Sequence, residues 1–200
     1  RAERCGPATR RTFSPMSSPL DEAAPPPYAA PIGVSDVSEG YYYHTMDVPG
    51  HGVVEGEWDL RGGVDDYLGH VDVAGKRVLE VGTASGFLCF EMERRGADVV
   101  AYDLSAAQSW DIVPYAALDP QALAQRRDHI TRLNKSWWFN HRAFDSRARV
   151  VYGTVYAVPP SIGAVDVCTF GAILLHVRDP FLALQSAAAL RPATIVVTEL

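Results

Sequence analysis

The sequence predicts an α/β fold with a mostly parallel sheet and helices on both of its faces. Three observations lead to this prediction. Short apolar runs alternate with segments of helical periodicity, glycines follow the first of these runs, and an acid stands at the end of the second. Ligands of such sheets bind beyond the carboxyl ends of the strands. The glycines and the acid both fall at those ends.

The first strand is expected at residues 77–81 (RVLEV), because this β-branched run is typical of a buried parallel strand. Gly82 allows the chain to turn sharply, and Gly86 allows close backbone approach at the start of the next helix. That helix is expected over residues 87–95. Gly96 follows it, where a glycine commonly ends a helix.

The second strand is expected at residues 98–103 and ends in Asp103, 21 residues after Gly82. A carboxylate there can accept hydrogen bonds from both hydroxyls of a cofactor ribose. The dinucleotide fingerprint G-x-G-x-x-G would require glycines where Ala84 and Phe87 stand. The pattern therefore favours a nucleoside-type cofactor and disfavours a nicotinamide oxidoreductase.

The rest of the chain continues the alternation of strands and helices. Asp119 is a good N-cap and Pro120 suits a first helical position, so a long helix is expected from there to Phe144. The other expected elements are strands at 149–152, 165–170 and 194–200, and a helix from Pro180 to Leu190.

The 200 residues suit one domain with a tail. Residues 1–35 are rich in Pro, Ser and Ala and are expected to be a disordered N-terminal tail. Residues 36–70 are aromatic and turn-rich and are expected to form an extension or lid, with a short helix near 63–68. Residues 71–200 are expected to form the cofactor-binding domain.

Composition limits the partners. A net charge of −6 argues against a broad nucleic-acid footprint, although basic residues between Arg126 and Arg149 leave open either a local basic groove or a solvated helix face. Three cysteines without C-x-x-C spacing predict neither a disulfide framework nor a zinc site, and favour a reducing, cytoplasmic setting. No apolar run approaches the length of a membrane span.

The spacing E-x-G-x-x-x-G, formed by Glu80, Gly82 and Gly86, resembles motif I of class I S-adenosylmethionine (SAM) methyltransferases. Flanking segments, from residue 42 to residue 200, are similar to the branch related to tRNA wobble-uridine methyl/carboxymethyl transferases: YYYHTMDV, WDLRG, SWDIVP, WWFNHRAF, RVVYG and GAILLHVRDPFLAL. The resemblance implies a Rossmann-like class I methyltransferase fold that is incomplete after its fifth strand. It also implies SAM as the methyl donor. The acidic charge favours a small-molecule acceptor over tRNA.

In that family the glycine turn lies against the methionine end of the cofactor and the acid holds the ribose. The resemblance therefore implies these cofactor-binding residues: Glu80, Gly82, Thr83, Ala84, Ser85, Gly86, Asp103, Leu104, Trp110, Thr154, Val155 and Gly171. Trp110 either stacks on the adenine or packs in the core. Thr154 and Ala157 stand where the family usually has acids in a G-D-x-Y-x-L-P pattern, which weakens the expected adenine contact.

Methyl transfer is an in-line displacement, so the protein must supply alignment and, where needed, a base; neither a metal nor a covalent nucleophile is required. His176 follows the fourth strand and is either that base or a residue that caps the next helix. His44 lies in the lid segment and either faces the cofactor and acceptor or packs at the surface.

Four residues are candidates for acceptor contacts. Tyr43 lies beside His44, and Arg61 either holds a carboxylate or forms a surface ion pair. Trp138 and Asn140 lie on the long helix and are expected to border the acceptor pocket. An alternative is a non-catalytic SAM-binding or scaffold protein with a degenerate fold, which Thr154, Ala157 and the missing later strands favour.

Overall fold

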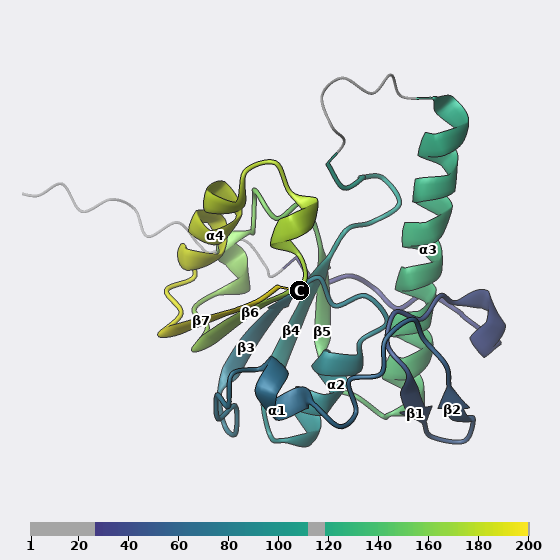
Figure 1. The fold of residues 1–200 in the computed structure, drawn as a ribbon, viewed down its shortest axis with the longest axis horizontal. Helices are drawn as coiled ribbons and strands as arrows, with labels where there is room; N and C mark the ends of the chain where they lie inside the picture. The colour runs from purple at the N-terminus through teal and green to yellow at the C-terminus, as the bar shows by residue number, and fades with distance from the viewer. Residues whose placement is uncertain (1–26, 112–118, 200) are drawn as a thin grey trace, which may run out of the picture.

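A five-stranded parallel sheet forms the centre of the molecule in the computed structural model, which describes residues 27–111 and 119–199 (Figure 1). Its strand order is β5-β4-β3-β6-β7, so the chain begins in the middle, moves outward on one side and then crosses to the other. The switch point lies between β3 and β6, where open α/β sheets bind ligands. The strands are β3 (Arg77–Val81), β4 (Asp98–Asp103), β5 (Arg149–Tyr152), β6 (Val167–Gly171) and β7 (Thr194–Thr198).

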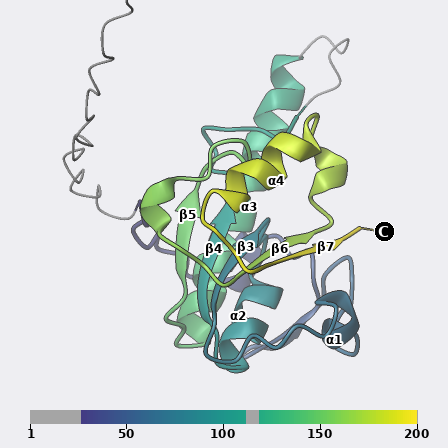
Figure 2. The ribbon, with the colours of Figure 1, turned by 90° about the vertical axis from the view of Figure 1, so that its left-hand side faces the viewer.

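Helices cover both faces of the sheet, as Figure 2 shows for α2 and α4. Alternating strand residues divide between two cores, because successive side chains of a strand point to opposite faces. Val78 packs in the core with α2 (Phe87–Arg94) and α3 (Pro120–Ala143), whereas Leu79 packs in the core with α4 (Pro180–Ala188). The predicted α/β fold with helices on both faces is confirmed.

The predicted strand bounds hold for β3, β4 and β5, and β6 begins two residues later than expected. Helix α4 ends at Ala188 and not at Leu190. The reason is a tight turn, in which Arg191 adopts a left-handed φ of 59° and its N–H donates to the carbonyl of Ala188 at 2.9 Å.

The N-terminal extension contains more regular structure than the sequence predicts. After η1 (Val37–Glu39), an antiparallel hairpin pairs β1 (Met46–Val48) with β2 (Gly52–Val54), and α1 (Val64–Tyr67) follows. Both residues that alternate inward on β1, Met46 and Val48, are buried. The hairpin therefore packs an apolar face on the domain, as a half-buried strand should.

The predicted disordered tail, 1–35, extends too far along the chain. Residues 1–26 lie outside the described residues, but Tyr28 and Ala29 contact strand β5 and Val34 contacts α3. The N–H of Ala29 donates to the carbonyl of Val150 in β5 at 2.8 Å, and Val34 is only 4% exposed. The segment thus provides a hydrogen-bond donor for a carbonyl of the edge strand β5. The composition of the segment gives no sign of this long-range contact.

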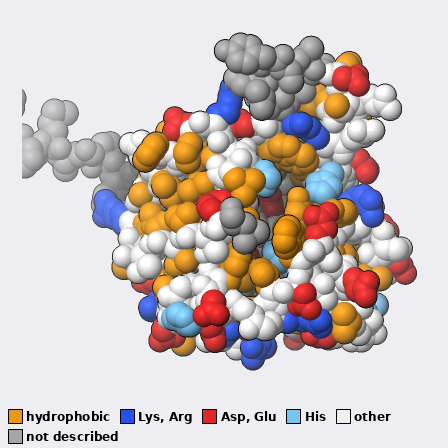
Figure 3. Space-filling model, viewed as in Figure 1, with side chains coloured by type: hydrophobic (Ala, Val, Ile, Leu, Met, Phe, Trp, Pro, Cys, Tyr) orange, Lys and Arg blue, Asp and Glu red, His pale blue; other side chains and the backbone are white. Residues whose placement is uncertain are grey.

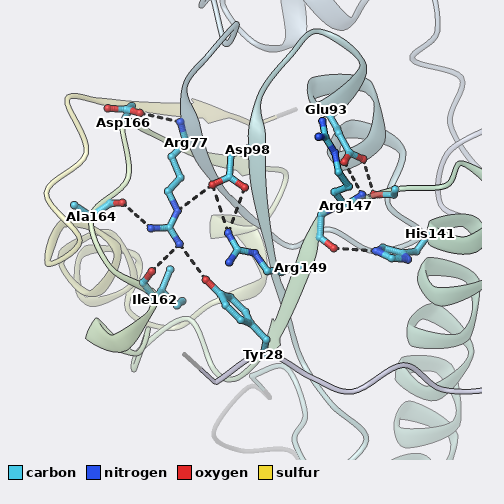
Figure 4. Close-up of polar contacts among 12 residues, drawn as sticks. Tyr28, Arg77, Glu93, Asp98, His141, Arg147, Arg149, Ile162, Ala164 and Asp166 are labelled. Atoms are coloured by element: carbon cyan, nitrogen blue, oxygen red, sulfur yellow. Dashed lines mark hydrogen bonds and ion pairs between the residues drawn. The ribbon is translucent and has the colours of Figure 1, made fainter. Parts of the chain in front are cut away.

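A polar cluster joins the amino ends of the strands (Figure 4). The Arg77 guanidinium donates to the carbonyl of Ile162 at 2.8 Å, the carbonyl of Ala164 at 3.3 Å and the hydroxyl of Tyr28 at 3.0 Å. Asp98 lies between Arg77 and Arg149, with nitrogen–oxygen distances of 3.5 and 3.3 Å. Arg77 thus ties η2 (Pro160–Ile162) and the N-terminal segment to the sheet.

We expect Arg77→Met to lower the free energy of unfolding by about 1–3 kcal/mol, because it leaves carbonyls without the charged donor that pairs with them. Urea denaturation measures this change. The control is Arg94→Met, whose side chain is 71% exposed and pairs only on the surface of α2, and which should shift stability by no more than about 0.5 kcal/mol. Equal effects of the two substitutions would contradict the prediction.

Candidate functional site

The turn between β3 and α2 has left-handed backbone at every second residue: φ is 82° at Gly82, 50° at Ala84 and 90° at Gly86. A Cβ at Gly82 would overlap the side chain of Ile173, and a Cβ at Gly86 would lie 2.9 Å from Cδ1 of Trp137. Glycine is therefore required at both positions. Ala84 takes the same backbone conformation at a cost of about 1–2 kcal/mol.

Asp103 holds this turn in place from the end of β4. Its Oδ2 accepts the N–H of Ala84 at 2.8 Å, and its Oδ1 accepts the N–H of Leu104 at 2.7 Å. Burial raises the pKa of Asp103, and the two N–H donors oppose that rise. A carboxylate offers about four lone-pair sites. Two remain free here, and they suit a pair of ribose hydroxyls.

Glu80 lies beneath the turn with 3% of its surface exposed, and its Oε2 has no hydrogen-bond partner among the described atoms. Burial raises the pKa of Glu80 to about 8, and the charge of Asp103 adds to the rise. Thr83, Ser85 and Thr169 are also buried, each with an unpartnered hydroxyl oxygen in the described structure. Such atoms are rare in folded proteins and indicate water or a ligand group.

The structure brings His44 to the turn. Its ring lies 5.5 Å from that of Phe87, the first residue of α2, and its Nδ1 is buried without a partner in the described structure. Burial lowers the pKa of His44 to about 4, so the imidazole is neutral at pH 7 and can accept a proton. Tyr43 is close enough to Asp103 for that carboxylate, together with burial, to raise the pKa of its phenol.

His176 is the last residue of η3 (Leu174–His176), directly after β6, and its side chain is exposed. The segment that carries it approaches the turn, because Ile173 covers Gly82. The N-cap of the next helix, α4, is Asp179, whose carboxylate accepts the N–H of Leu182 at 2.9 Å, so His176 does not cap that helix. The predicted role of His176 stays a prediction.

Trp110 belongs to an aromatic cluster and is half-buried. Its ring meets the His129 ring edge-on at 5.7 Å, and His129 also contacts Tyr41 at 4.4 Å. The guanidinium of Arg126 lies 5.2 Å from the Trp110 ring. His129 comes from α3 and has no motif around it, so no sequence signal identified it.

Two expected acceptor contacts are already engaged elsewhere. Arg61 makes two bonds to Asp59, at 2.7 and 2.9 Å, and reaches Asp47 at 3.1 Å. The surface ion pair, the alternative reading of Arg61, is therefore the one observed. Trp138 is buried and donates from Nε1 to the hydroxyl of Tyr152 at 3.1 Å, so it does not border an open acceptor pocket beside the turn.

Asn140 is fully buried and acts as a structural link where an acceptor contact was expected. Its amide donates to the carbonyl of Ser85 at 2.8 Å, and its Oδ1 accepts the hydroxyl of Tyr42 at 3.2 Å. Asn140 therefore connects α3 and the N-terminal extension to the glycine turn. Both ends of its amide are thus engaged by protein groups.

The loops after β5 and β6 complete the site. The carbonyl of Thr154 accepts the hydroxyl of Tyr102 at 2.9 Å, and Thr154 and Val155 are half-buried. At Gly171, the end of β6, a Cβ would lie 2.7 Å from the hydroxyl oxygen of Tyr67. Tyr67 was not predicted as a site residue, because nothing in the sequence relates α1 to β6.

Three loops are also joined by a cluster that the sequence did not predict. The Tyr156 hydroxyl donates to Asp111, and the N–H of Arg178 donates to the same carboxylate at 2.7 Å. These residues follow β5, β4 and β6 respectively, so their contacts span the carboxyl end of β3. The loops that follow β4, β5 and β6 are therefore joined to one another beyond the carboxyl end of β3.

Figure 3 shows a hollow near the centre of the face that Figure 1 presents, above the carboxyl ends of the strands, with histidines around it. Two cavities lie away from the glycine turn. One of about 430 Å³ lies between the extension and α3 and is lined by Tyr41, Glu57 and Arg132 among others. Another of about 300 Å³ is lined by Trp138 and Arg142. Neither contains a residue of the glycine turn.

A profile of the family described as Methyltransferase domain matches residues 59–200. The chain therefore belongs to this methyltransferase family. The match includes the glycine turn, Asp103 and all five strands of the sheet. Family membership supports S-adenosylmethionine as the cofactor. No curated protein matches the sequence.

The chain is similar to solved structures. The N-terminal domain of EvdMO1, determined in the presence of SAH and D-fucose, has a TM-score of 0.50 and 19% identity, over 80% of this chain and 59% of that one. An S-adenosylmethionine dependent methyltransferase from Mesorhizobium loti has a TM-score of 0.42 and 17% identity, over 66% and 49%. The chain thus spans about half the length of these structures.

Within residues 27–111 and 119–199, no helix is both long enough and apolar enough to cross a membrane. The same residues contain no group of three or more His, Cys, Asp or Glu side chains placed to hold a metal ion.

We expect the stability of the protein to fall between pH 6.5 and pH 8 because of Glu80. Its folded pKa of about 8 lies above the ordinary value of 4.5, so the folded state keeps a proton that the unfolded state has lost. The stabilisation is fully present below pH 4.5 and disappears as pH rises through 8, at about 1.4 kcal/mol per pH unit. Urea unfolding at both pH values measures it.

Glu80→Gln should remove this pH dependence, because the amide is neutral at every pH. Glu55→Gln, at an exposed position in the extension, is the matched control and should retain it. His44 does not interfere with this measurement. Its pKa is lowered from 6.5 to about 4, so it reduces the stability of the protein only as the pH falls below 6.5. An unchanged slope in Glu80→Gln would show that Glu80 is already ionised.

Proposed function

We propose that this protein transfers a methyl group from S-adenosylmethionine to a small-molecule acceptor. The observation that carries the proposal is the carboxylate of Asp103, which fixes the glycine turn and keeps two lone-pair sites for ribose hydroxyls. S-adenosylmethionine supplies an electrophilic methyl group when bound. Family membership supports this cofactor.

The residues of the chain have separate tasks in this proposal. The turn from Gly82 to Gly86 lies along the cofactor, and Glu80, Thr83 and Ser85 offer unpartnered polar atoms beneath it. His44, neutral at pH 7, takes a proton from the acceptor.

We infer that residues 36–70 act as a lid over the domain formed by residues 71–200. From this segment, His44 contacts Phe87 at the end of the turn, and Tyr43 lies within reach of the charge of Asp103. The sheet then holds the cofactor, and the extension shapes the space beside it.

A small acceptor is favoured because several basic residues of α3 and β5 are engaged within the protein. Lys135 pairs with Glu39 at 2.9 Å, Arg149 pairs with Asp98 at 3.3 Å, and Arg142 donates to the carbonyl of Val34. A nucleic-acid surface needs such cations free to face phosphates. The free, buried thiols of Cys89 and Cys168 support a reducing compartment such as the cytoplasm.

We expect Asp103→Ala to weaken S-adenosylmethionine binding by about tenfold or more, because it removes charge-assisted hydrogen bonds to the ribose. Gly82→Val should weaken binding at least as strongly, because its φ of 82° is strained for valine. Isothermal titration calorimetry measures both. Asp128→Ala, at an exposed position on α3, is the control. Unchanged affinity in both variants would contradict the cofactor assignment.

Methyl transfer itself is tested with radiolabelled S-adenosylmethionine and a cell extract separated into small-molecule and tRNA fractions. We expect label in the small-molecule fraction, and expect it to be lost with Asp103→Ala. Label in tRNA would overturn the choice of acceptor. Intact cofactor binding without any transfer would favour a non-catalytic SAM-binding protein, the alternative that Thr154 and Ala157 suggest.

A further inference from the structure

Tyr67 lies at the carboxyl end of the sheet although it belongs to the N-terminal extension. Its ring covers Gly171, where a Cβ would lie 2.7 Å from the hydroxyl oxygen and 2.9 Å from Cε1. Its backbone carbonyl accepts the hydroxyl of Thr198, at the end of β7, at 2.6 Å. Tyr67 is thus fixed between the ends of β6 and β7.

Glu199 lies on the other side of the same loop. Its Oε1 accepts the N–H of Leu174 at 2.8 Å, and the N–H of Ala172 donates to the carbonyl of Thr198 at 2.7 Å. One carboxylate oxygen of Glu199 therefore has a backbone donor, and the side chain is exposed. Tyr67 and Glu199 thus contact the two ends of the loop from residue 171 to residue 174, and the charge of Glu199 reaches the phenol of Tyr67.

This loop is next to the cofactor turn, because the side chain of Ile173 covers Gly82. Glu80 and Thr169 are partners in the β3–β6 register, so their side chains share one face of the sheet, the face on which Tyr67 packs. Both are buried, and Glu80 Oε2 and Thr169 Oγ1 have no partner among the described atoms. Buried polar groups without a partner in the described structure therefore lie on the face of the sheet against which Tyr67 packs.

The charges agree with this geometry. Burial raises the pKa of Tyr67, and the carboxylates of Glu199 and Glu80 raise it further, so the phenol stays protonated and neutral. Arg178, which follows η3, is already paired with Asp111 at 3.4 Å. The space beside Tyr67 therefore presents its phenol oxygen and the negative charge of Glu199, which select a group that carries N–H donors or a positive charge.

We infer that Tyr67 and Glu199 hold the nucleophile of the acceptor and that this nucleophile is an amine, so that the reaction is an N-methylation. The inference rests on the proposed function. The amine binds through N–H bonds to the two side chains and must lose any extra proton before it attacks. Its lone pair then forms the N–C bond while the S–C bond breaks, and the bonding pair stays on sulfur. The surplus proton of the methylated nitrogen passes to a base or to water.

The test uses two cofactor analogues and the 200-residue chain. In sinefungin an amine-bearing carbon replaces the methylated sulfur of S-adenosylmethionine, so its amine projects where the methyl would be. S-adenosylhomocysteine has no group there. Calorimetry should show sinefungin binding about tenfold more tightly than S-adenosylhomocysteine to the wild type. Tyr67→Phe and Glu199→Gln should each reduce that ratio several-fold and leave S-adenosylhomocysteine affinity nearly unchanged.

Matched controls are Tyr28→Phe, at the opposite end of the strands, and Glu55→Gln in the extension, which should keep the wild-type ratio. A wild-type ratio near one, or a ratio unaffected by both site substitutions, would overturn the inference while leaving cofactor binding intact. Failure of both analogues to bind the wild type would instead overturn the proposed function, and the inference with it.

Discussion

The hydrogen bond from the N–H of Ala84 to Asp103, at 2.8 Å, is the interaction on which the site depends. It joins the turn after β3 to the end of β4, two strands that already pair in register. An alanine with a φ of 50° is unfavourable by about 1–2 kcal/mol. A charge-assisted bond of this length is worth about as much, so the carboxylate can hold a backbone that the residue alone would not choose.

The turn in its fixed position then organises segments that are far apart in the sequence. Its last glycine lets Phe90 and Trp137 pack against the start of α2, and the carbonyl of Ser85 accepts the amide of Asn140 at 2.8 Å. Asn140 in turn accepts the hydroxyl of Tyr42 from the extension. Several buried polar atoms near the turn lack hydrogen-bond partners in the described structure. Proteins commonly leave buried polar groups unsatisfied at the sites where they bind a ligand.

The strands and the glycine turn could be predicted because their signals are local. Apolar runs identified β3, β4 and β5 to the residue, and glycine spacing located the turn. Asn140 was misjudged although a signal existed: it lies seven residues after Leu133 and three after Trp137, on the buried stripe of α3. Arg61 could also have been paired with Asp59, two residues away.

The contacts at Tyr67 and His129 were unpredictable for a different reason. Tyr67 meets Gly171 more than one hundred residues later, and His129 meets Trp110 across a loop. Such pairs arise only when the sheet order brings β6 beside β3 and when α3 packs back along the domain. Neither the sheet order nor the packing of α3 produces a recognisable pattern in the sequence around Tyr67 or His129.

The N-terminal extension supplies side chains on both sides of the glycine turn. His44 approaches from the α2 side, with its ring 5.5 Å from Phe87, and Tyr67 closes the β6 side over Gly171. The sheet itself offers the groups that suit a cofactor: the turn, Asp103 and Glu80. The sheet topology fixes the strand ends that carry the turn and Asp103, whereas His44 and Tyr67 both come from one short segment that precedes the sheet. In the function proposed here, a change of acceptor would therefore need substitutions in that segment more than in the sheet.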